Sequence, residues 1–135
     1  MTASAEARPD YPTPAWFVPQ ALCVHSGWRY SSQRPTPHAR PEYRLAGRWW
    51  WRTVRVGSGE AAWDEVNAYG GGMQMLVSTF NRAAALSHGR LRAARSNADI
   101  ASRSAGEQVY AAFLIVRADG DWREWPNTSR ACGLR

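Results

Sequence analysis

Apolar residues recur at the three-to-four-residue spacing of an amphipathic helix in two parts of the chain. Residues 15–26 form the first, and Gly27 is a plausible stop signal at its end. The second is residues 74–86, which Ser87-His88-Gly89 terminates. We expect a helix over each stretch, with Cys23 on the core side of the first.

A capping box predicts the third helix. Ser104 is followed three positions later by Glu107 and then by the apolar run Val109–Val116, so we expect a helix over about 105–118. The Arg/Ala/Ser-rich residues 89–103 are ambiguous, although Asn97 or Asp99 could cap a short helix that ends near Ser102.

Strict alternation appears only in the first half of the chain. Residues 43–45 and 49–56 flank Ala46-Gly47-Arg48, and aromatic, arginine and β-branched residues alternate along the second segment. This pattern predicts a β-hairpin with one Trp/Arg-rich face. Residues 1–14 carry three prolines and no periodicity, so we expect a disordered leader. We expect 122–126 and the Cys132 tail to be irregular and to pack on the first helix.

The chain has 135 residues, which fits a single α+β domain with a modest core. All seventeen basic residues are arginine, and seven of them lie in residues 28–56 against one acid, Glu42. The remaining ten arginines are balanced by ten acids, so the net charge of +6 belongs to this segment. Arginine interleaved with aromatic residues is typical of a single-stranded nucleic-acid surface, but it equally suits an anionic cell wall or a solvated face.

A candidate site lies in Gly57-Ser58-Gly59-Glu60-Ala61-Ala62-Trp63 and the following Tyr69-Gly70-Gly71-Gly72-Met73-Gln74. Glu60 sits among small residues, where a bulky substrate can approach it. A general acid for glycoside cleavage needs a raised pKa, which apolar surroundings such as Trp63, Tyr69 and Met73 could provide. The alternative is a surface glutamate on a glycine loop. Close backbone approach to a substrate or a packing turn explains the three glycines better than a phosphate loop does.

These motifs carry a resemblance to a known family. Glu60-x-x-Trp63, Tyr69–Gln74 and Ser78-Thr79-Phe80 resemble the core of the actinobacterial transglycosylase-like domain of the resuscitation-promoting factors. Residues 21–24 are similar to the family's N-terminal cysteine helix. Glu107-Gln108, Trp122–Pro126 and the residues from Cys132 resemble its C-terminal end. The match spans roughly residues 15–27 and 57–134, with the blocks in the family's order.

The resemblance implies a small, mostly helical lysozyme-like domain over residues 15–135, with 28–56 inserted as a probable β-hairpin. It implies cleavage of the β-1,4 bond between N-acetylmuramic acid and N-acetylglucosamine in peptidoglycan, with Glu60 as general acid. No cofactor is expected. The expected glycan-binding residues are Trp63, Tyr69, Gln74, Thr79, Gln108 and Trp125; of Trp122 and Trp125 we expect one in the core and the other in the cleft.

Three questions stay open at this point. The family places its glutamate a few residues after the cysteine helix, whereas 36 residues separate Cys23 from Glu60 here. A single glutamate suffices for a lytic transglycosylase, in which the muramoyl 6-hydroxyl closes an anhydro ring, but a hydrolase needs a second carboxylate, and Asp64 and Glu65 are nearby. The alternative function is a non-catalytic module that binds cell wall or nucleic acid through 28–56.

The two cysteines could be buried thiols, but the resemblance favours a Cys23–Cys132 disulfide and thus an oxidising compartment. We therefore expect a secreted or wall-associated monomer that acts on peptidoglycan strands and not on nucleic acid. No signal peptide is visible in residues 1–14. We expect a truncated or mis-started reading frame to explain why this signal is missing. No apolar run is long enough to span a membrane. Cys23-x-His25, with only distant His38 and His88, is too sparse for a metal site.

Overall fold

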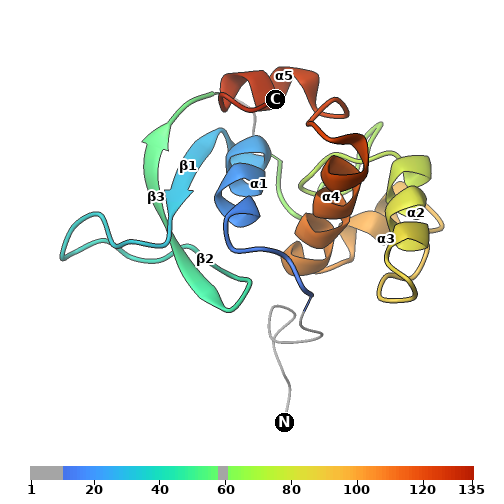
Figure 1. The fold of residues 1–135 in the computed structure, drawn as a ribbon, viewed down its shortest axis with the longest axis horizontal. Coiled ribbons are helices and arrows are strands. Elements are labelled where there is room, and N and C mark those ends of the chain that lie inside the picture. The colour runs from blue at the N-terminus through green and yellow to red at the C-terminus, as the bar shows by residue number, and fades with distance from the viewer. Residues whose placement is uncertain (1–10, 58–60) are drawn as a thin grey trace, which may run out of the picture.

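A small antiparallel sheet packs against one side of a helical body (Figure 1). The computed structural model describes residues 11–57 and 61–135. The elements follow in the order α1 (Phe17–Ser26), β1 (Trp28–Ser31), β2 (Tyr43–Leu45), β3 (Arg48–Arg55), α2 (Val77–Leu86), α3 (Asn97–Ala101), α4 (Ala105–Asp119) and α5 (Pro126–Ala131). The expected α+β class is confirmed.

The predicted hairpin is present as β2 and β3. Leu45 pairs with Arg48 across a two-residue turn, and both turn residues, Ala46 and Gly47, have positive φ, as a type I′ hairpin turn requires. The hairpin is part of a larger sheet, because β1 pairs antiparallel with the other edge of β3. The strand order β1-β3-β2 therefore makes the basic segment 28–56 a three-stranded sheet.

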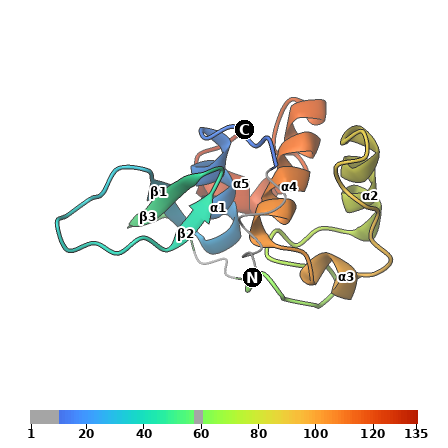
Figure 2. The same cartoon turned by 90° about the horizontal axis from the view of Figure 1, so that it is seen from below.

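Helix α1 lies between the sheet and helix α4 (Figures 1 and 2). Its residues Phe17, Val18, Ala21 and Leu22 are fully buried. Pro19 is accommodated because it falls in the first turn, where no intrahelical N–H bond is lost. Gly27 ends the helix in the left-handed region, with φ 73°.

The capping box starts α4 as predicted. Ser104 caps the helix by accepting a hydrogen bond on its hydroxyl from the backbone N–H of Glu107. From Val109 to Ile115 every side chain of α4 is buried, so this helix forms the centre of the helical body. Short helix α3 is capped by Ser96 rather than by Asn97 or Asp99.

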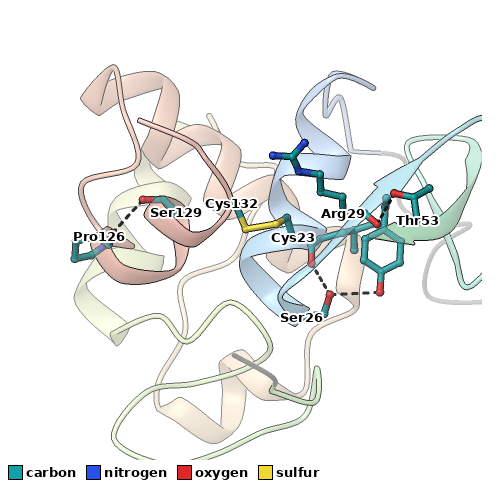
Figure 3. The surroundings of a disulfide bond; sticks show 9 residues. Cys23, Ser26, Arg29, Thr53, Pro126, Ser129 and Cys132 are labelled. Atoms are coloured by element: carbon teal, nitrogen blue, oxygen red, sulfur yellow. Dashed lines mark hydrogen bonds between the residues drawn. A yellow bond between two sulfur atoms is a disulfide. The ribbon is translucent and has the colours of Figure 1, made fainter. Parts of the chain in front are cut away.

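Residues 126–131 correct the expected irregular C-terminus. They form α5, which Pro126 starts at a position where the missing N–H has no cost. The predicted disulfide is present: Cys132 follows α5 and is bonded to Cys23 of α1, with a Cα–Cα distance of 6.0 Å (Figure 3). Trp122 stacks on Phe17 with ring centroids 5.0 Å apart. The C-terminal segment thus packs on α1, as expected.

The predicted leader falls mostly outside the described residues. Its last part, residues 11–14, is described, and here Tyr11 stacks on Tyr110 of α4 with ring centroids 5.2 Å apart. Burial and the nearby Glu107 carboxylate raise the pKa of Tyr11 to about 12. Among the residues that the structure describes, no helix combines the length and apolar character needed to cross a bilayer.

Candidate functional site

The basic segment of residues 28–56 leaves the helical body and returns to it at the same point. Gly27, which ends α1, accepts hydrogen bonds on its carbonyl oxygen from the backbone N–H groups of Val56 (2.8 Å) and Gly57 (3.0 Å). The sheet formed by residues 28–56 therefore begins and ends beside the C-terminus of α1. The expected general acid, Glu60, lies outside the described residues, and the nearest described residues before and after it are Gly57 and Ala61.

Ala61 lines a pocket at the C-terminal end of α1. The walls combine apolar surface with amides, a hydroxyl and one carboxylate, and they come from α1, the loop of residues 61–76 and α5: Val24, His25, Ala61, Glu65, Asn67, Gly72, Met73, Gln74, Trp125 and Thr128. This mixture suits a polar ligand with some apolar faces, such as a sugar.

Two of the expected glycan-binding residues line this pocket. Gln74 is half-buried, has φ 54° and donates a hydrogen bond from its side-chain amide to the carbonyl oxygen of Gly71 (2.9 Å). A positive φ at a non-glycine residue is a strained conformation of the kind that is enriched at functional sites. Trp125 is 7% exposed and donates from Nε1 to the carbonyl oxygen of Met73 (2.7 Å), which fixes its ring in the pocket wall. Its neighbour Trp122 belongs to the core.

Gln108 occupies a different place from the one expected for a residue that contacts glycan. It has no exposed surface. Its Oε1 accepts from the N–H of Gly72 (2.8 Å), and its Nε2 donates to the carbonyl oxygens of Trp63 and Arg103, each at 2.9 Å. These three bonds pair the Gln108 amide with three backbone groups, so it is not available to bind a ligand. Gln108 therefore holds the glycine loop in place.

The three glycines form a packing turn. A Cβ on Gly70 would lie 2.6 Å from the carbonyl oxygen of Asn97, and one on Gly72 would lie 2.5 Å from Cε3 of Trp63. A Cβ on Gly71 would overlap the amide oxygen of Gln108. Each glycine thus admits a different neighbour to the backbone, which is one of the two interpretations that the sequence allowed.

Trp63 packs behind this turn. Its half-buried indole stacks on the imidazole of His25 with ring centroids 3.9 Å apart. Nδ1 of His25 lies 3.0 Å from the carbonyl oxygen of Gly72, so Nδ1 carries the proton in this contact, because a carbonyl can only accept. Nε2 of His25 lies 3.4 Å from the hydroxyl of Tyr43 in β2. Burial raises the pKa of Tyr43 above its ordinary value.

Two other expected residues lie outside the pocket. Tyr69 is 44% exposed at the loop surface, and its backbone N–H bonds to the side-chain oxygen of Asn67. Thr79 is half-buried on α2. Neither lines the pocket around Ala61, so their contact with glycan stays a prediction.

Sequence reasoning missed several pocket residues. His25 was considered as part of the first helix and as a metal ligand, whereas it stacks on Trp63 and forms part of the pocket wall. Thr128 was missed because α5 was not predicted. Of the two nearby carboxylates, Glu65 lines the pocket and is half-buried, while Asp64 is exposed and does not line it. Within residues 11–57 and 61–135, no group of three or more potential metal-ligating side chains comes together.

In comparisons with protein-family models, with curated proteins and with solved structures, no match to this chain was found. The resemblance described above therefore rests on the residues of its motifs.

Proposed function

We propose that the protein is a peptidoglycan-cleaving glycosidase of lysozyme-like fold that acts on the bond between N-acetylmuramic acid and N-acetylglucosamine, with Glu60 as general acid. The observation that carries this proposal is the return of the chain to Gly27. Because Val56 and Gly57 bond to Gly27, the residue directly after the cysteine helix, Glu60 follows that helix by only a few residues once the sheet is set aside. This is the spacing of the resembled family, so the insertion is compatible with the motif.

The pocket beside Ala61 supports the same proposal. It holds amide and hydroxyl groups that can bind sugar hydroxyls, from Asn67, Gln74 and Thr128, against the indole wall of Trp125. In the proposed reaction Glu60 donates its proton to the glycosidic oxygen as the bond from that oxygen to the muramoyl C1 breaks. When the muramoyl 6-hydroxyl attacks C1, the Glu60 carboxylate that remains takes the proton of that hydroxyl.

The attacking group decides the reaction type. If it is the muramoyl 6-hydroxyl, the product is an anhydro ring and Glu60 alone suffices. If it is water, a second carboxylate is needed. That carboxylate either takes a proton from the attacking water or attacks C1 itself before water releases the sugar. Glu65 is the candidate because it lines the pocket, whereas Asp64 does not.

The test is digestion of purified peptidoglycan, with soluble products identified by mass spectrometry. We expect Glu60→Gln to lower turnover by a factor of about a hundred to ten thousand while wall binding persists. Asp64→Asn is the matched control and should retain activity. If the wild type releases anhydromuramoyl products and Glu65→Gln is still active, the protein is a lytic transglycosylase. If the wild type releases products with reducing ends and Glu65→Gln does not, the protein is a hydrolase. Absence of products from the wild type, with wall binding intact, refutes the enzyme and leaves the binding module.

A further inference from the structure

A strongly basic surface lies on the loop and hairpin of residues 32–49, which we call the hairpin surface. Arg34, Arg40, Arg44 and Arg48 are all exposed. None of the four forms an ion pair with any residue in the described parts of the chain. Four exposed cations in one short segment repel each other, and an anionic partner would relieve that repulsion.

The one acid of this surface is already neutralised. Glu42 accepts from Nε of Arg52 at 3.0 Å and from the hydroxyl of Tyr30 at 3.0 Å. It therefore leaves the positive charge of the four arginines uncompensated.

The aromatic residues argue against single-stranded nucleic acid as the partner. Such surfaces use exposed rings on which successive bases stack. Here Trp50 and Tyr30 are buried in the core, and Tyr43 faces His25. Trp49 is 46% exposed, and the Arg44 guanidinium lies 5.5 Å from its ring centroid. Trp28 and Trp51 are half-buried, so Trp49 is the one aromatic ring on the described part of 28–57 that is largely exposed. Charge, rather than stacking, is what this surface offers.

The arrangement of the arginines favours a linear ligand. Figures 1 and 2 both show the loop between β1 and β2 extending away from the helical body. Arg44 lies on β2, Arg48 begins β3, and Arg34 and Arg40 belong to the loop. No described pocket gathers two of these four side chains. Cations spread along a projecting segment suit an extended polyanion better than a single small anion.

We propose that the hairpin surface binds a linear phosphodiester polyanion attached to the cell wall, at a site separate from the pocket beside Ala61. The choice of a wall polymer rests on the proposed function and on the disulfide, which fits an extracellular compartment. The binding is electrostatic, so it holds the enzyme on its substrate without contributing to bond cleavage.

The test is co-sedimentation with purified cell walls, before and after hydrofluoric acid has removed the phosphodiester polymers. All proteins carry Glu60→Gln, so that the walls are not digested during the measurement. The test variant is Arg40→Gln/Arg44→Gln/Arg48→Gln. Its matched control is Arg90→Gln/Arg92→Gln/Arg95→Gln, which removes the same charge from exposed positions between α2 and α3, away from the sheet.

We expect the hairpin variant to bind untreated walls about tenfold or more weakly, while the control variant binds as the parent does. The dependence of log Kd on log salt should become shallower by about one for each removed arginine that contacts phosphate. Acid-stripped walls should bind parent and hairpin variant equally. Equal loss of binding in both triple variants overturns the proposal, and so does parent binding that is unchanged after the phosphodiester polymers have been removed.

Single-stranded DNA is the competing probe. If it binds the parent more tightly than the phosphodiester polymer released from walls, the surface is a nucleic-acid site and the proposal is wrong. Failure of the proposed enzymatic function gives a different result, because loss of glycan cleavage leaves this charge-dependent wall binding unchanged.

Discussion

Gly72 is the point where the candidate site has least tolerance for added volume. A Cβ at this position would lie 2.5 Å and 2.9 Å from Cε3 and Cδ2 of Trp63 and 2.8 Å from Nδ1 of His25. Neither ring can move freely, because they stack on each other and His25 is also bonded to the Gly72 carbonyl. Overpacking of this kind costs about 1–3 kcal/mol. Loss of the His25 hydrogen bond adds about 1 kcal/mol. We therefore expect Gly72→Ala to lower the free energy of unfolding by about 2–4 kcal/mol.

Urea denaturation followed by tryptophan fluorescence measures this loss, and Gly106→Ala is the control. A Cβ on Gly106 meets only ordinary contacts at 3.7 Å or more, and the residue lies in α4, where alanine is the better helix former. Gly106→Ala should therefore leave stability unchanged or raise it by up to about 1 kcal/mol. In a double-mutant cycle, Gly72→Ala should lower the unfolding free energy much less when Trp63 has already been changed to Ala. A Gly72→Ala protein that is as stable as the Gly106→Ala protein would refute the packing account.

Three further predictions concern stability. Gln108→Leu leaves three buried backbone groups without partners, so it should lower the unfolding free energy by about 2–4 kcal/mol in urea denaturation, whereas an unchanged midpoint would contradict its structural role. Cys23→Ala/Cys132→Ala opens a loop spanning 109 positions and should cost about 2–5 kcal/mol, with a matching loss in the reduced wild type. Burial raises the pKa of Tyr30 from 10 to about 12, so its contribution is complete below pH 10 and declines as the pH rises to 12. Unfolding measured across that range should show a shallower decline for Tyr30→Phe, and an identical decline would contradict this.

Local signals predicted the elements whose own residues determine them. The Ser104 capping box and the Gly27 stop are local chemistry, and both ends lie where expected. Strand β1 and helix α5 were missed for a common reason. β1 has four residues and α5 has six. Segments this short do not show the two-residue alternation of a strand or the 3.6-residue periodicity of a helix clearly. Both are stabilised by distant partners, β3 in one case and α1 through the disulfide in the other.

The candidate site shows the same division. The motifs assigned Trp63, the glycine run and Gln108 to one candidate site, and the structure shows that they contact each other. The direction of each side chain depends on tertiary packing, which motifs do not contain. Gln108 therefore turned out to be buried, and Glu65 could not be separated from Asp64 until their exposure was known.

The sheet of residues 28–56 contacts the candidate site through Tyr43 in addition to carrying the exposed arginines. Its two ends meet at Gly27, so a direct Gly27–Gly57 connection would need little added chain. Such a deletion would also remove Tyr43, whose hydroxyl lies against Nε2 of His25 and whose ring packs edge-on against Trp63 with centroids 6.1 Å apart. The deletion would therefore take a phenol away from a ring that lines the pocket. One face of the segment therefore supports the pocket through Tyr43, while its exposed arginines remain available to a separate ligand.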